Sequence, residues 1–385
     1  MENNRNFFIT IALSVLILAV WQYFYVLPRS EAQREAARVE QQRIEEQKKA
    51  AGTDTGTPAA PGAIPNAPGT DAVTPAGREQ ALATTTRAKI DTPSLEGSIN
   101  LTGARLDDLK LKHYTETVDK NSPEISLLNP AALPNGYYAE IGFVGNDKTG
   151  AVPGPETVWT VDGNATLTPT TPVTLTYSND KGLTFKRTFS VDTDYMFTVS
   201  DTVQNAGTAA VSLSNYGRVT RFDKPLVAST YVLHEGLIGF TGTEGLQEHK
   251  YASIESDKQF TPGKSTDGWL GITDKYWAVT LVPTEKQPFQ PRYAFFEDGR
   301  HRYQSDFLTD PITVAAGQSA TVESEIFAGA KEVGKINAYA EDRQIKRFDL
   351  LIDWGWFHFI TKPMFWLIDT LYKFFGNFGL AILAT

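Results

Sequence analysis

The stretch LTFKRTFSVDTDYMFTVSDTV, residues 183–203, decides the fold that the sequence predicts. Apolar and polar residues alternate in both of its halves, as in β-strands that bury one face. In the first half Leu183, Phe185 and Phe189 share a face, and the Asp192-Thr193-Asp194 tripeptide between the halves supplies turn residues. The stretch therefore predicts an antiparallel hairpin, and this reading is favoured over a cation-binding loop at the two aspartates.

Similar runs recur on both sides of this hairpin and predict more strands. They are Ser98–Leu101, Tyr138–Phe143, Val173–Tyr177, Trp277–Val282, Arg292–Phe296 and Ser319–Phe327. Turn dipeptides separate them, namely Asn135-Gly136, Asp162-Gly163, Asp267-Gly268 and Asp298-Gly299. Many short strands with few helical stretches favour a mainly β fold, an antiparallel sandwich or barrel. We predict one extended sandwich over residues 84–329.

The N-terminal residues 1–28 predict a transmembrane anchor. Phe7–Leu27 carries no formal charge, and a helix of that length would reach about 31 Å, enough to cross a hydrocarbon core. Trp21 and Tyr23 near its end are expected at the membrane interface. Bulky residues take the place of a small-residue cleavage site, so an uncleaved anchor is favoured over a signal peptide.

The charges beside this anchor leave its orientation open. Arg5 precedes it, whereas several arginines, beginning with Arg29 and Arg34, follow it closely. The positive-inside rule would place the C-terminal flank in the cytoplasm, but interleaved glutamates and the length of the following domain weaken that count. Residues 29–83 predict a charged, solvated helix and then a disordered linker rich in proline, alanine and glycine.

The C-terminal residues predict a return to the membrane. A connecting helix is expected over residues 330–347, an interfacial amphipathic segment over 348–377, and the start of a transmembrane helix over 378–385 that would continue beyond this chain. The amphipathic helix is expected to begin at Pro363, with a thin polar strip. The residues expected at the interface are Trp354, Trp356, Lys362, Trp366, Asp369 and Lys373. The alternative is a buried helix of a soluble core.

Composition argues against several other classes of function. The formal net charge is −9 without a strongly basic block, so nucleic-acid binding is not expected. The chain has no cysteine, and its five histidines lack metal-ligand spacing. Asp107-Asp108 and His234-Glu235 are interpreted as solvated turn residues. We therefore expect no cofactor, no metal and no catalytic site.

Five stretches taken together resemble one family. They are NFFITIALSVLILAVWQYF at the N-terminus, INLTGARLDDLKLKHY (99–114), FKRTFSVDTDYMFTVSDTVQN (185–205), GWLGITDKYWA (268–278) and FDLLIDWGWFHFITKPMFWLIDTLYKFFGNFG (348–379). In this order they resemble the YidC/Oxa/Alb membrane protein insertases, in the bacterial form with a large periplasmic domain.

The resemblance implies an inner-membrane insertase and chaperone, not an enzyme, that is multi-pass in its full length. The large domain would be a periplasmic β-supersandwich of the galactose mutarotase-like kind. The implied partners are nascent inner-membrane proteins, components of the Sec translocon and the lipid bilayer. The hydrophilic groove of the family would lie beyond Thr385, so this chain would lack it.

Two other readings remain open. The sandwich could bind or epimerise a sugar through His234 with Glu235 or Glu244, on fold analogy alone. It could also act purely as a docking module for the translocon.

Overall fold

A computed structural model describes residue 64 and residues 77–385, except 120, 226–232, 243, 284–286 and 356–357. Contacts divide the chain into two compact units, residues 1–60 and 61–385, and all described residues belong to the second. The predicted N-terminal anchor and the charged helix lie outside the described residues.

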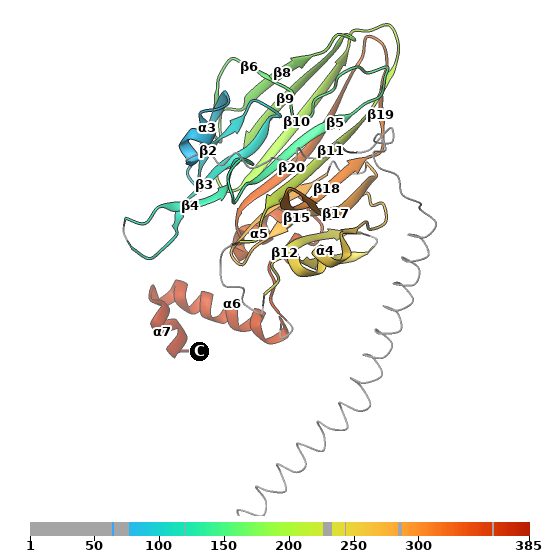
Figure 1. Cartoon of the computed structure of the whole chain (residues 1–385). Helices are drawn as coiled ribbons and strands as arrows, with labels where there is room; N and C mark the ends of the chain where they lie inside the picture. The colour runs from blue at the N-terminus through green and yellow to red at the C-terminus, as the bar shows by residue number, and fades with distance from the viewer. Residues whose placement is uncertain are drawn as a thin grey trace, which may run out of the picture. The chain divides into compact units, whose positions relative to one another are not determined.

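Two β-sheets form the body of the second unit (Figure 1). The larger has eleven strands: β1 (Arg87–Asp91), β2 (Leu95–Asn100), β3 (Arg105–Thr115), β4 (Glu124–Leu128), β5 (Tyr137–Val144), β7 (Thr166–Leu167), β11 (Val211–Phe222), β14 (Gln259–Phe260), β17 (Phe289–Asp298), β18 (Arg300–Thr309) and β19 (Ile312–Val314). Its main order is β14-β17-β18-β11-β5-β3-β2-β1-β7, with β4 beside β3 and β19 beside β11. All its pairs are antiparallel except β1 with β7.

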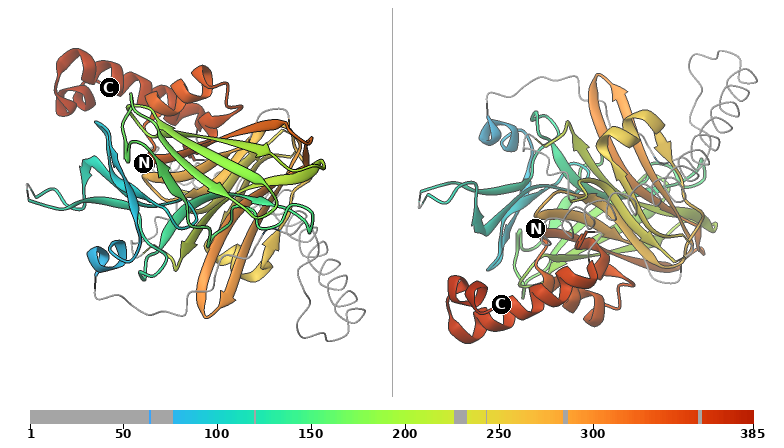
Figure 2. Two further views of the ribbon diagram at one scale, coloured as in Figure 1. Left: turned by 90° about the horizontal axis from the view of Figure 1, so that it is seen from above. Right: turned by 90° about the horizontal axis from the view of Figure 1, so that it is seen from below.

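The smaller sheet is wholly antiparallel. It has nine strands: β6 (Thr160–Asp162), β8 (Val173–Ser178), β9 (Leu183–Val191), β10 (Met196–Asn205), β12 (Gly236–Thr241), β13 (Gly245–Lys250), β15 (Gly268–Thr273), β16 (Trp277–Val282) and β20 (Ser319–Ala330). Their order is β13-β12-β15-β16-β20-β10-β9-β8-β6. Figure 2 shows the two sheets from above and below.

The described residues form fewer helices than strands. The helices are α3 (Arg78–Leu82), α4 (Tyr251–Asp257), α5 (Val333–Asp342), the 3-10 helix η2 (Phe348–Leu351), α6 (His358–Phe375) and α7 (Phe378–Leu383). Helix α4 contacts β13, β14 and β17, and Figure 2 shows it in yellow beside the orange strands of the larger sheet.

The hydrophobic core lies between the sheets, as the alternation predicts. Leu183, Phe185 and Phe189 of β9 are buried in one continuous cluster that draws on both sheets. Each of the predicted strands overlaps an observed one, and β9 and β16 match residue for residue. The prediction of a mainly β sandwich is confirmed.

The turn between β9 and β10 explains the two aspartates of the opening stretch. The Oδ1 atom of Asp192 accepts hydrogen bonds from the backbone nitrogens of Asp194, at 2.9 Å, and Met196, at 3.1 Å. A carboxylate that caps its own turn in this way fixes the reversal of the chain. The hairpin reading is therefore correct.

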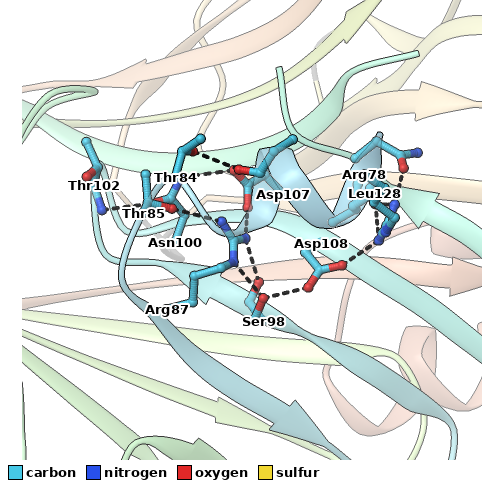
Figure 3. Close-up of polar contacts among 12 residues, drawn as sticks. Arg78, Thr84, Thr85, Arg87, Ser98, Asn100, Thr102, Asp107, Asp108 and Leu128 are labelled. Carbon is cyan, nitrogen blue, oxygen red and sulfur yellow. Dashed lines mark hydrogen bonds and ion pairs between the residues drawn. The ribbon is translucent and has the colours of Figure 1, made fainter. Parts of the chain in front are cut away.

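The contacts around β2 and β3 correct the interpretation of Asp107 and Asp108 (Figure 3). Asp107 and Asp108 are buried strand residues of β3, not solvated turn residues. Asp107 pairs with Arg87, and Asp108 pairs with Arg78 of α3. Paired guanidinium groups and hydrogen-bonding neighbours such as Ser98 offset the desolvation of these carboxylates. Helix α3 therefore orders the last residues of the segment predicted as linker.

Candidate membrane-interface segment

After β20 the chain forms α5, which packs on the turn between β9 and β10. Ile336 and Tyr339 of α5 are buried. The Tyr339 hydroxyl donates to Asp192 Oδ2 at 2.8 Å and accepts from the backbone nitrogen of Tyr195 at 3.0 Å. The predicted connecting helix is thus shorter than residues 330–347 and belongs to the body of the sandwich.

Helix η2 continues the core. Phe348 and Leu351 are buried at 0% and 1% exposure. The Phe348 ring lies edge-on to Trp269 of β15, at 5.4 Å between centroids, and to Phe327 of β20, at 5.6 Å. The first turn of the segment predicted as interfacial therefore belongs to the core, because it packs against side chains of β15 and β20 in the smaller sheet.

Asp353 fixes the turn that leads out of the core. Its Oδ2 atom accepts from the backbone nitrogen of His234 at 2.8 Å, and its Oδ1 atom accepts from that of Gly355 at 2.7 Å. Gly355 has φ +69°, a left-handed value that a residue without a Cβ adopts at low cost. One carboxylate thereby joins the exit turn to the entry of β12.

Helix α6 follows and exposes an unusual amount of apolar surface. Its exposed apolar side chains are Phe359, Ile360, Met364, Phe365, Trp366, Leu367, Tyr372, Phe374 and Phe375. A contiguous surface of this kind on a described helix marks an interaction site for a partner or a membrane. The alternative of a buried helix in a soluble core is not what the structure shows.

The polar residues of α6 form a narrow strip, as predicted. Lys373 Nζ and Asp369 Oδ2 lie 2.6 Å apart at i, i+4 spacing. Lys362 Nζ lies 5.6 Å from the centroid of the Trp354 ring and 3.9 Å from Asp349 Oδ2. An apolar face with a thin charged strip is the pattern of helices that lie in the plane of a membrane interface.

Helix α6 starts five residues earlier than predicted, at His358, so Pro363 lies inside it. Proline lacks a backbone N–H and cannot donate the hydrogen bond of an ordinary helix residue. Pro363 lies in the second turn of α6. The proline therefore removes one bond near the start and leaves the rest of the helix intact.

Helix α7 begins after a break, with Asn377 as its N-cap. The Asn377 side chain accepts from the backbone nitrogen of Leu380 at 3.1 Å, and Gly376 takes φ +63° between the two helices. Phe378, Leu380, Ile382 and Leu383 of this short helix are exposed. Among the described residues, no helix combines the length and the apolar character needed to cross a membrane.

The structure brings together some of the residues predicted at the interface. Trp354 and Lys362 are neighbours, and Asp369 pairs with Lys373. Trp366 is 65% exposed, and its backbone carbonyl accepts from the Thr370 hydroxyl at 2.8 Å. Trp21, Tyr23 and Trp356 lie outside the described residues.

Sequence reasoning missed two residues of this region. Asp353 lies in one of the stretches that carry the resemblance but was given no role, although Asp-x-Gly is a common signal for a side chain that caps its own turn. Phe365 packs edge-on against Trp354, at 5.3 Å between centroids, and so joins the exit turn to α6.

The residues of the sugar-binding alternative do not form a site. His234 is buried, and its Nε2 atom lies 3.0 Å from the carbonyl of Leu237. Burial lowers the pKa of this imidazole to about 4. Glu244, in contrast, is exposed and accepts from the backbone nitrogen of Gly263 at 2.6 Å. A neutral imidazole that is bound to its own loop is poorly placed for acid–base chemistry.

A cleft of about 580 Å³ lies over the outer face of the smaller sheet, beside the loop that joins α5 to η2. Its charged lining is paired within the protein. Lys346 Nζ lies 2.8 Å from Asp267 Oδ2, and Arg343 Nη1 lies 2.7 Å from Glu325 Oε1. These ion pairs hold the loop against the sheet.

A family model described as the YidC periplasmic domain matches residues 87–367. That range covers the two sheets, α5, η2 and the first half of α6. The chain therefore belongs to the family of YidC periplasmic domains.

Curated relatives match over the whole chain. The protein named membrane protein insertase YidC from Mesorhizobium japonicum is 88% identical, and that from Brucella melitensis biotype 1 is 60% identical. In both cases the match covers 100% of this chain and 64% of the relative. The chain thus spans somewhat less than two thirds of the length of these relatives.

Solved structures give more distant matches. A galactose mutarotase related enzyme from Lactobacillus acidophilus has a TM-score of 0.44 at 12% identity, over 63% of this chain and 97% of that one. A putative aldose 1-epimerase from Escherichia coli K12 has a TM-score of 0.38 at 11% identity, over 64% of this chain and 99% of that one.

Proposed function

We propose that this chain is the periplasmic part, with its membrane attachments, of an insertase that helps inner-membrane proteins enter the bacterial inner membrane. The names of the curated relatives support this proposal. The observation that carries it is the exposed apolar face of α6, joined through Asp353 and η2 to a packed sandwich. The function requires no covalent chemistry, and the protein acts as a chaperone for membrane segments, not as an enzyme.

The physical task is to lower a transfer barrier. Polar groups of a client segment that enter hydrocarbon without partners cost several kcal/mol each. A helix that lies in the interface disturbs the packing of the lipid beside it, and local thinning of a bilayer shortens the apolar path. In this proposal α6 is that helix, on the periplasmic side of a multi-pass protein, and nascent inner-membrane proteins and the Sec translocon are the partners.

The test is the depth of α6 in a membrane. The chain has no cysteine, so Met364→Cys and Lys373→Cys each give a single labelling position for a fluorophore. Met364 belongs to the apolar surface, and Lys373 to the polar strip. In vesicles of phosphatidylethanolamine and phosphatidylglycerol, lipid-borne quenchers should act on the label at 364 and aqueous iodide on the label at 373.

Other outcomes would count against the proposal. Iodide access at both positions would mean that α6 stays in water, and lipid quenching at both would mean that the helix is immersed. In cells depleted of their own insertase, the longer protein with Met364→Glu should support growth less well than the parent. Burying a methionine contributes about 2 kcal/mol, so the affinity of α6 for the membrane interface should fall roughly 30-fold in this variant.

A further inference from the structure

The turn between β15 and β16 carries an exposed aromatic residue in a stretch that the proposed function does not use. Lys275 and Tyr276 form this turn, within the sequence GWLGITDKYWA. Tyr276 is 57% exposed, although its neighbours Asp274 and Ala278 are buried. A single exposed tyrosine is ordinary on a protein surface, so the surroundings of this one decide its meaning.

Contacts of the residues on both sides of the turn hold it in place. Asp274 Oδ2 lies 2.5 Å from Arg221 Nη1 of β11, in the other sheet. The Trp277 ring packs edge-on against Tyr114 of β3, at 5.1 Å between centroids. Since both flanking residues are fixed in this way, Lys275 and Tyr276 are presented on a stable support.

The half-buried Lys275 and the exposed Tyr276 form an aromatic–cation pair. Lys275 Nζ lies 4.9 Å from the centroid of the Tyr276 ring. Tyrosine prefers the headgroup layer of a membrane because its ring is apolar and its hydroxyl is polar, and lysine ends its apolar stem in a charge that stays in water or among phosphates. The pair therefore has the chemistry of a membrane-interface contact.

The turn also lies beside the point where the chain leaves for α6. The backbone nitrogen of Lys331 donates to the carbonyl of Tyr276 at 2.9 Å. Lys275 lines a small pocket of about 80 Å³ together with Ile352 and Asp353. Asp353 precedes His358, the first residue of α6, by five positions, and five residues span at most about 17 Å. The turn and the start of the helix are thus close neighbours.

We propose that the Lys275–Tyr276 turn is a second membrane contact of the sandwich and binds the lipid headgroup layer. This inference rests on the proposed position of α6 in the interface. One interfacial helix leaves the sandwich free to rotate about the axis of that helix. A second contact on a rigid turn removes this freedom, and the two linked contacts bind more tightly than either alone. The sandwich is then held at one orientation over the bilayer.

The experiment uses the whole chain with Tyr276→Cys, labelled with an environment-sensitive fluorophore. On addition of phosphatidylethanolamine and phosphatidylglycerol vesicles, the emission should shift to the blue, quenching by iodide should fall, and headgroup-borne quenchers should act. Val158→Cys is the matched control, because Val158 is 70% exposed and precedes β6. β6 is six strands from β15, about 29 Å across the sheet.

The label at Met364→Cys separates the two proposals. If lipid quenches position 364 while position 276 behaves like position 158, the inference about the turn is overturned and α6 stays at the interface. If lipid reaches position 276 but not position 364, the turn contact stands and the placement of α6 fails. Iodide access at all three positions overturns both. Lipid access at 276 and 364, with iodide access at 158, supports both.

Discussion

At the scale of the residue, one buried ion pair joins the two sheets through the core. Arg187 of β9 and Asp201 of β10 are register partners, and two nitrogens of the guanidinium lie 2.8 Å from the two carboxylate oxygens. A third nitrogen donates to the carbonyl of Ile141 in the larger sheet at 2.8 Å. The Trp159 ring lies 5.0 Å from the same guanidinium. The arginine therefore has its main hydrogen-bonding partners inside the protein.

Removing one member of this pair should lower the free energy of unfolding more than removing both. Asp201→Leu leaves a buried guanidinium without its carboxylate and should lower the free energy of unfolding by about 3–5 kcal/mol. The double variant Arg187→Leu/Asp201→Leu should recover a large part of that loss, because no charge stays buried. Denaturant unfolding followed by circular dichroism measures both. Equal losses in the single and the double variant would contradict the explanation.

His234 should make the stability of the sandwich depend on pH. Its folded-state pKa of about 4 lies below the ordinary value of 6.5 because burial disfavours the charged form. As the pH falls between these values, the unfolded chain binds the proton first, so the free energy of unfolding should decrease by up to about 3 kcal/mol. Below about pH 4 this loss is complete.

The control for this pH dependence is His234→Gln, whose amide can still donate to the carbonyl of Leu237. Carboxylates titrate in the same range, so the quantity of interest is the difference between parent and variant in the free energy of unfolding. That difference should change between pH 6.5 and 4 and stay constant above pH 7. A difference that is flat throughout would show that the imidazole does not titrate differently on folding.

At the scale of the element, strands with a regular apolar pattern were predictable, and some strands with buried polar residues were not. The alternation in β9 gave its bounds, and the apolar run of β16 gave the bounds of that strand although both of its faces are buried. β11 and β18 were missed because polar residues fill their second face. Arg218 and Arg302 are buried there, and Arg218 pairs with Glu140 at 2.9 Å. A pattern of hydropathy treats such residues as exposed, since it carries no information on the partner across the sheet.

The C-terminal helix illustrates a different limit. The sequence predicted the amphipathic character of α6, because the strip of Asp369 and Lys373 follows from helical spacing alone. Its start was predicted at Pro363, since a proline at the first turn is the common case. The earlier start at His358 depends on the exit turn at Asp353 and Gly355. Those contacts involve His234, more than a hundred positions away, and no local rule supplies them.

At the scale of the whole molecule, the boundary between the sandwich and α6 is the feature that the sequence placed least well. Phe348–Leu351 and the residues after it read as one apolar, aromatic run. The structure divides this run: Phe348 is in the core, and Phe374 is 81% exposed on α6. Both are phenylalanines in similar local surroundings, so only the packing of distant strands distinguishes them.

This division predicts that the same substitution, phenylalanine to alanine, has different effects in the core and on α6. Phe348→Ala removes a ring that contacts Trp269 and Phe327, and a cavity at that place should lower the free energy of unfolding of the sandwich by about 3–5 kcal/mol. Phe374→Ala should leave the unfolding of the sandwich unchanged within about 0.5 kcal/mol and weaken only the binding of vesicles. Near-ultraviolet circular dichroism in denaturant reports the first quantity, and flotation with vesicles reports the second. If both variants shifted the unfolding midpoint equally, α6 would belong to the cooperative unit of the sandwich, and the core would not end at η2.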